Sequence, residues 1–152
     1  MKTTKKIEPI IVIDTREQLP YKFEGRKSFV GTVKSGDYSI YGYEDKFAIE
    51  RKTLGDFAAC VAGGRERFER EIQRLAKLEF AAVVIEANYD EIRDADLFTK
   101  VSRNSIINTA FKWTLKYHIP FVFVSNRAGG ECAITNYVDA YFKYVVYGDK
   151  CW

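Results

Sequence analysis

The hydrophobic and polar positions of the chain follow two different periods, one typical of strands and one of helices. Residues 10–14 (IIVID) form a run of β-branched side chains that ends in an acid, which is the pattern of a buried strand. Two later apolar runs, residues 80–87 (FAAVVIEA) and 119–126 (IPFVFVSN), also predict strands. Residues 31–52 predict a pair of strands joined by a turn at residues 44–46 (Glu-Asp-Lys).

Apolar residues three and four positions apart predict four helices. The first is short, within residues 53–62, with Thr53 as its N-cap and a Gly63-Gly64 break behind it. The others are predicted over residues 65–78, over 102–118 and from Ile134 onward. Their apolar positions are Phe68, Ile72, Leu75 and Leu78; Ile106, Ile107, Ala110, Phe111, Trp113 and Tyr117; and Tyr137, Val138, Tyr141, Phe142, Val145 and Val146.

Strands and helices therefore alternate along the chain after an early antiparallel hairpin. This order predicts an α/β fold with a central mixed β-sheet flanked by helices on both faces. We find no internal repeat and no linker in residues 1–152, so we expect a single domain.

Composition and charge narrow the function only slightly. The 24 basic and 21 acidic side chains leave a net charge of +3, which is too small to argue for nucleic acid by itself. The three cysteines include no C-x-x-C pair, which argues against a zinc site or a disulfide framework and favours free thiols. We find neither a signal peptide nor a membrane span, so we expect no membrane partner and a cytoplasmic protein, or a nuclear one in a eukaryote.

The end of the predicted hairpin carries candidate chemistry. Side chains alternate along a strand, so Glu50 and Lys52 share one face, roughly 7 Å apart at their Cα atoms, while Arg51 faces the other way. Asp37 begins the preceding strand, and antiparallel pairing should bring it beside Glu50 and Lys52. Asp14, at the end of the first buried strand, can reach the same edge of the sheet.

Two acids and a lysine at one point have two interpretations. Paired carboxylates are hard oxygen ligands for Mg²⁺, and a lysine beside them can act on an attacking water and a phosphate, as a metal-dependent phosphodiesterase requires. The alternative is a cross-strand salt bridge on a solvated face, worth under about 1 kcal/mol. The spacing alone favours neither interpretation.

Longer motifs resemble a known family. The stretch GDYSIYGYEDKFAIERKTLGDF contains Gly-Asp, then Glu-Arg-Lys, then an Asp four residues after the Lys. It resembles the signature of the nuclease domain of the XPF/Mus81 family, also called the ERCC4 domain. The upstream VIDTREQ and the downstream GGRERFEREIQRL and AAVVIEA resemble that family's opening strand, helix and next core strand. The resemblance covers roughly residues 10–87.

The resemblance implies a restriction-endonuclease-like core that cuts DNA with Mg²⁺, or Mn²⁺ in its place. Asp37 and Glu50 would hold the metal, with Asp14 as a further candidate ligand. Lys52 would act on the attacking water and on the scissile phosphate. The signature also includes Arg51 and Asp56, which we expect to pair and brace the site. Arg16 and Glu17 match the opening motif and are expected to assist with DNA or metal.

Other basic and aromatic residues are weighed against ordinary surface and core roles. Arg65 and Arg67, in the predicted helix at 65–78, are candidate DNA contacts, with bracing of the site as the alternative role of Arg65. Arg70 and Lys77 are expected on a solvated face with glutamate partners. The final helix carries more aromatic residues than one buried face needs, which favours a homodimer or a partner subunit. The sole histidine, His118, is expected to be an ordinary residue at a helix end.

The predicted function is a divalent-metal-dependent DNA endonuclease in repair or recombination, with a preference for branched, flap or junction DNA. Members of the family usually carry a helix-hairpin-helix module, and some a helicase-like region. Neither is recognisable here, so we expect a stand-alone nuclease domain. The alternatives are a catalytically silent DNA-binding or scaffolding subunit, a plain α/β interaction domain, and a nuclease with another substrate range, RNA included.

Overall fold

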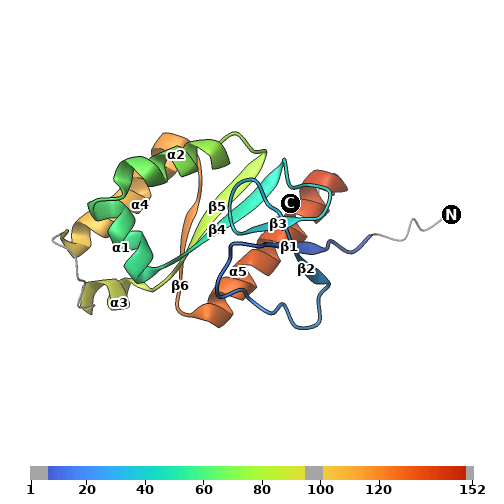
Figure 1. Cartoon of the computed structure of the whole chain (residues 1–152), viewed down its shortest axis with the longest axis horizontal. Coiled ribbons are helices and arrows are strands. Elements are labelled where there is room, and N and C mark those ends of the chain that lie inside the picture. The colour runs from blue at the N-terminus through green and yellow to red at the C-terminus, as the bar shows by residue number, and fades with distance from the viewer. Residues whose placement is uncertain (1–6, 95–100, 150–152) are drawn as a thin grey trace.

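A six-stranded mixed sheet lies between helices in the computed structural model, which describes residues 7–94 and 101–149 (Figure 1). The strands are β1 (Ile11–Asp14), β2 (Ser28–Gly31), β3 (Tyr38–Ile40), β4 (Phe47–Thr53), β5 (Phe80–Glu86) and β6 (Phe121–Val124). The helices are α1 (Leu54–Ala62), α2 (Arg65–Leu75), α3 (Tyr89–Asp94), α4 (Arg103–Tyr117) and α5 (Arg127–Ala140), which continues into a π-helical segment, η1 (Tyr141–Val146). The predicted α/β class is confirmed.

The direction of the strands determines which loops meet. The strand order is β2-β1-β3-β4-β5-β6, and β3 pairs antiparallel with both of its neighbours while the other pairs are parallel. All strands except β3 therefore end at one edge of the sheet, where β3 begins. Open α/β sheets bind ligands outside the carboxyl ends of their strands, so this edge is where a site is expected.

Two apolar cores cover the two faces of the sheet. On one face Ala48, Val83 and Ile85 pack with residues of α1, α2 and α4, among them Trp113. On the other face Phe47, Ile49, Ala82 and Val84 pack with residues of α5 and η1. Figure 1 shows α1, α2 and α4 together on one side of the sheet and α5 on the other. The alternation of side chains along β4 and β5 thus supplies both cores.

The structure also corrects the sequence prediction at several elements. Thr53 caps α1 as predicted, because its hydroxyl accepts a hydrogen bond from the Asp56 N–H. Strand β2 and helix α3 were not predicted, and α5 begins at Arg127 rather than near Ile134. Phe111, predicted in the apolar stripe of its helix, is 53% exposed, and the buried residues of that helix are Ile106, Thr109, Ala110 and Trp113.

Of the helices in the described ranges, none is long and apolar enough to cross a lipid bilayer.

Candidate active site

The signature residues Asp37, Glu50 and Lys52 meet at the carboxyl edge of the sheet. Glu50 and Lys52 point from β4 toward α2, and the Lys52 Nζ lies 2.9 Å from Glu50 Oε1. The same ammonium lies 4.9 Å from the ring centroid of Phe68, which belongs to α2. The Glu50 side chain is 5% exposed and that of Lys52 18%, so this ion pair is not the solvated surface bridge of the alternative interpretation.

Backbone geometry explains why a glycine precedes Asp37. Gly36 has φ +82°, and a Cβ there would lie 3.0 Å from the carbonyl oxygen of Ile49. The Asp37 N–H donates to that same carbonyl at 2.8 Å, and Asp37 Oδ2 accepts from the Arg51 N–H at 2.8 Å. The loop before β3 is therefore pressed against β4, which holds the Asp37 carboxylate beside Glu50.

A hollow of about 190 Å³ lies beside these acids. Asp14, Asp37 and Glu50 line it, together with Glu71 from α2. Its basic lining residues are Arg16, Lys34 and Arg74. The predicted proximity of Asp14 to Asp37 and Glu50 is thus what the structure has, while Glu71, Lys34 and Arg74 were not predicted there.

Burial and mutual repulsion make the carboxylates hard to ionise. Burial raises the pKa of Asp37 to about 6, although the hydrogen bond from the Arg51 N–H opposes this, and the charge of Glu17 adds to the rise. Burial and the nearby Asp37 also hold the pKa of Glu50 well above its usual range, against the pull of Lys52. A cation in the hollow would relieve both effects.

Asp14 is more firmly engaged than the other acids. It is 2% exposed, accepts from Arg16 Nε at 2.7 Å through Oδ2 and from the Val33 N–H at 2.9 Å through Oδ1. Burial alone would raise the pKa of Asp14, but the hydrogen bonds from Arg16 and Val33 outweigh it and lower the pKa. Asp14 therefore lines the hollow as an ionised carboxylate whose two oxygens already have partners.

Arg51 does not pair with Asp56, so that prediction is wrong. Its side chain lies on the α5 face of the sheet and makes two hydrogen bonds to Glu17, at 2.9 and 2.8 Å, and one to Glu86, at 3.0 Å. Asp56 is exposed on α1, which packs on the opposite face. The alternation along β4 separates the two residues by the thickness of the sheet.

Three residues predicted to contact DNA do not line the hollow: Glu17, and Arg65 and Arg67 of α2. The Glu17 side chain is only 5% exposed and is occupied by Arg51, so it is no free DNA contact. Arg65 lies 5.4 Å from the centroid of the Trp113 ring and donates to Thr109 Oγ1 at 3.3 Å, which links α2 to α4. Arg67 is exposed on the same helix, and neither of these two arginines lines the hollow.

The lining residues that the sequence did not predict were missed for two reasons. Glu71 and Arg74 lie next to the buried Ile72 and Leu75, and only the rotation of α2 against the sheet brings them to the hollow. A sequence signal existed, because a residue adjacent to a helix's apolar stripe lies at the border of the buried face. Lys34 lies in the loop before Asp37, where periodicity says nothing.

The donor set suits a hard cation that binds few protein ligands. Mg²⁺ usually takes one or two carboxylates and completes its shell with water and substrate oxygens, which matches Asp37 and Glu50. Over residues 7–94 and 101–149 there is no group of three or more acidic, histidine or cysteine side chains that could enclose a metal by itself. Any cation here would therefore be shared with solvent or substrate.

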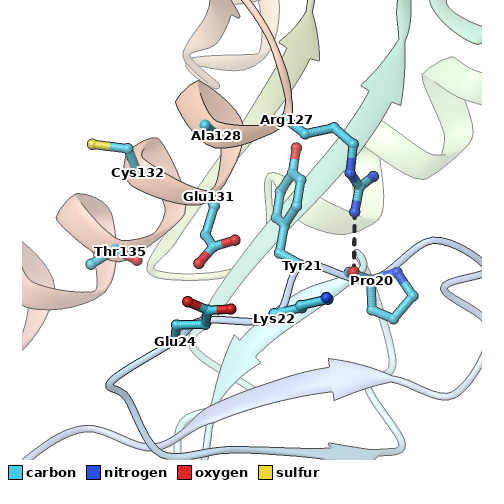
Figure 2. A pocket seen from close by; sticks show the side chains of 9 residues that line it. All are labelled: Pro20, Tyr21, Lys22, Glu24, Arg127, Ala128, Glu131, Cys132 and Thr135. Carbon is cyan, nitrogen blue, oxygen red and sulfur yellow. Dashed lines mark hydrogen bonds between the residues drawn. The ribbon is translucent and has the colours of Figure 1, made fainter.

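A larger hollow lies elsewhere in the described part of the molecule. It measures about 500 Å³ and lies between residues 20–24 and the first turns of α5 (Figure 2). None of Asp14, Asp37 or Glu50 lines it. Size alone is therefore not the criterion for the candidate site, which rests on the clustered acids.

Comparison with known proteins bears on the family and the fold. The ERCC4 domain matches residues 13–129, which is more than half of the chain. A search of curated proteins finds no match. The chain is similar to the solved structure of XPF from Aeropyrum pernix, with 21% identity and a TM-score of 0.70 over 86% of this chain and 60% of that one. A complex of XPF from the same organism with DNA matches with 20% identity and a TM-score of 0.71, over 90% of this chain and 66% of that one.

The match covers less than two thirds of either XPF chain. At this level of identity the similarity establishes the fold, which is the predicted restriction-endonuclease-like core. The family itself rests on the domain match over residues 13–129. The chain belongs to the ERCC4 domain family, the nuclease-domain family of XPF-type proteins.

Proposed function

We propose that the protein is a divalent-metal-dependent endonuclease that hydrolyses phosphodiester bonds in DNA. The observation that carries the proposal is the convergence of Asp37 and Glu50 on one hollow at the carboxyl edge of the sheet, with the Lys52 ammonium 2.9 Å from Glu50. Two buried carboxylates that repel each other are costly for a folded protein, and a metal site is a function for which such an arrangement is suited.

Asp37 and Glu50 would hold Mg²⁺, for which Mn²⁺ can substitute, with Asp14 on the adjoining wall of the hollow. When bound, the metal supplies a water of lowered pKa and offsets negative charge on the scissile phosphate. Both roles require an open coordination position, and a hollow with two available carboxylates leaves room for one.

The lysine and the basic residues would act on the phosphate. The Lys52 ammonium, oriented by Glu50, is suited to donate hydrogen bonds to the attacking water and to a non-bridging phosphate oxygen. Arg16, Lys34 and Arg74 line the same hollow and can bind flanking phosphates of the strand. In the reaction the water oxygen would bond to phosphorus as it loses a proton, one phosphorus–oxygen bond of the backbone would break, and the departing oxygen would take up a proton.

The substrate we propose is branched, flap or junction DNA, acted on in repair or recombination, with the protein working as a homodimer or beside a partner subunit. The support is the family membership and the likeness to an XPF chain whose structure is a complex with DNA. A catalytically silent DNA-binding subunit is the alternative function.

A panel of labelled substrates tests this proposal. Linear duplex, single strand, 3′ flap, fork and four-way junction DNA are incubated with Mg²⁺ or Mn²⁺, and in parallel with EDTA. Cutting that needs the metal supports the endonuclease, and the preferred substrate identifies its class. Binding without cutting would favour the silent subunit, and an absence of both would contradict the proposal.

A further inference from the structure

A buried charged network lies on the opposite face of β4 from the proposed catalytic residues. The Arg51 guanidinium is 8% exposed and is held by two acids from separate parts of the fold, Glu17 after β1 and Glu86 at the end of β5. Glu86 Oε1 accepts from Arg51 Nη1 at 3.0 Å and also from the Tyr21 hydroxyl. The Arg127 Nη1 lies 3.9 Å from the same oxygen.

We propose that Tyr21 and Glu86 are positioning residues for the catalytic site, an inference that rests on the proposed function. Glu86 fixes the Arg51 side chain, and the Arg51 backbone N–H in turn donates to Asp37 Oδ2 at 2.8 Å. Glu50 and Lys52 flank Arg51 on the same strand, so the anchored Arg51 also sets the orientation of their backbone. Two residues on the far face of the sheet thereby control the separation of the two carboxylates.

Tyr21 is itself held by contacts to its ring, its hydroxyl and its backbone N–H. Its ring stacks on that of Tyr38, with centroids 5.5 Å apart, and its N–H donates to the Tyr38 hydroxyl at 3.0 Å. The guanidinium carbons of Arg51 and Arg127 lie 5.6 and 4.9 Å from its centroid. Figure 2 shows the Tyr21 ring between residues 20–24 and α5, and the hydrogen bond that Arg127 donates to the Pro20 carbonyl oxygen. Tyr21 therefore has one orientation, with its hydroxyl on Glu86.

Helix α5 is shaped to admit the Tyr21 hydroxyl. A Cβ built on Gly130 would lie 2.0 Å from the Tyr21 oxygen and 2.7 Å from the ring carbon that carries it. Any side chain at position 130 would push Tyr21 away from Glu86. The close approach of α5 to the Tyr21 ring thus depends on this glycine, although a glycine inside a helix lowers the stability of the helix.

The charges of the network argue for a role beyond stability. Burying Arg51 with two glutamates, Glu17 and Glu86, incurs a desolvation cost that their attraction often fails to recover, and apolar residues of similar volume often pack as well or better. The charged groups fix the orientation of the Arg51 side chain, since bidentate arginine–carboxylate contacts have a defined geometry. A fixed Arg51 is useful because its backbone N–H binds Asp37, which must be held beside Glu50 in the hollow.

The test compares two variants that each remove one buried tyrosine hydroxyl. Tyr21→Phe removes the bond to Glu86, and Tyr141→Phe removes a bond of 3.1 Å to Glu79 on the same face of the sheet, at the amino end of β5. We expect Tyr21→Phe to lower kcat about tenfold with KM for DNA within twofold, and to weaken Mn²⁺ binding measured calorimetrically without DNA by a similar factor. Tyr141→Phe should change neither quantity.

Gly130→Ala provides an independent test, because it displaces Tyr21 without changing its chemistry. It should reproduce the loss of kcat and of Mn²⁺ affinity, whereas Gly63→Ala, where a Cβ meets nothing within 4 Å, should not. If Tyr21→Phe matches Tyr141→Phe in both readouts while the wild type cuts DNA, the positioning role is refuted and the proposed function stands. A wild type that cuts no DNA refutes the proposed function, and the Mn²⁺ titration then decides the positioning role alone.

Discussion

At the scale of single residues, Asp37 illustrates a conflict between stability and the proposed function. Its carboxylate is held by the Arg51 N–H and faces Glu50 in a largely buried hollow. An acid whose pKa is higher in the folded protein than in the unfolded chain lowers stability once the pH rises above the unfolded value. For Asp37 the rise from 3.8 to about 6 means that the cost appears as the pH increases from about 4 to 6 and persists above it.

Removal of that charge should therefore stabilise the metal-free protein. Asp37→Asn keeps an oxygen for the Arg51 N–H, and we expect its free energy of unfolding at pH 7.5 in EDTA to exceed that of the wild type by about 1–3 kcal/mol. At pH 4 the difference should nearly vanish, because the wild-type carboxyl is protonated in the folded state. Urea denaturation at the two pH values measures this, with the exposed turn variant Asp45→Asn as the control. Equal stability of Asp37→Asn and wild type at pH 7.5 would contradict the assigned burial cost.

Lys52 offers a second prediction at this scale. Lys52→Met removes the ammonium, and with it both the ion pair with Glu50 and the cation–π contact with Phe68. Loss of a preorganised donor at a reacting phosphate should reduce the single-turnover cleavage rate about a hundredfold or more. Lys46→Met is the matched control, since Lys46 also lies over an aromatic ring, that of Tyr43, in the same hairpin. A similar rate for the two variants would mean that Lys52 has only a structural role.

At the scale of elements, the orientation of α2 decides which of its charges face the site. Phe68, Ile72 and Leu75 are buried against the sheet, and this places Glu71 and Arg74 at the hollow while Arg70 points to solvent. The same rotation explains why Arg65 packs on Trp113 instead. One helix therefore contributes both to the core and to the rim of the proposed site.

DNA binding should distinguish the two arginines of this helix. Arg74→Ala is expected to weaken binding severalfold and to lower the slope of log affinity against log salt by about one, because one phosphate contact is lost. Arg70→Ala, exposed on the same helix but away from the hollow, should leave both quantities near wild type. Fluorescence anisotropy over a salt series, in EDTA to prevent cutting, provides the measurement. An equal loss for both variants would indicate that the whole helix face binds DNA without regard to the hollow.

The elements also show how far sequence alone could go. Glu50 and Lys52 were predicted on one face, and Asp37 beside them, because the two-residue period and the antiparallel hairpin determine these positions locally. The Arg51 network was not predicted, because Glu17 and Glu86 lie 34 and 35 residues away and meet Arg51 only through the parallel pairing of β5 and the loop after β1. Strand β2 escaped prediction because Phe29 and Val30 are both exposed at the sheet edge, so no alternation marks it.

At the scale of the whole molecule, the two faces of the sheet carry different groups of charged residues. The α2 side carries the acids, Lys52 and the basic rim, and the α5 side carries the network around Arg51. The aromatic residues of the final helix belong partly to the core. The ring centroid of Tyr141 lies 5.1 Å from that of Phe47, and the ring centroid of Tyr137 lies 5.1 Å from that of Phe80. That packing accounts for much of the aromatic surplus, and a dimer through this helix stays a prediction.

The most direct test of the account is the rate of cleavage by wild type and by Glu50→Gln on the best substrate of the panel, as Mg²⁺ is titrated from zero. Glutamine keeps the shape of Glu50 and an oxygen for Lys52 but removes the charge that would bind the metal. We predict cutting by the wild type that saturates with Mg²⁺ and is abolished by EDTA, and a rate for Glu50→Gln at least about a hundredfold lower at every concentration. Metal-dependent cutting that Glu50→Gln retains at the wild-type rate would contradict the assignment of this hollow as the active site.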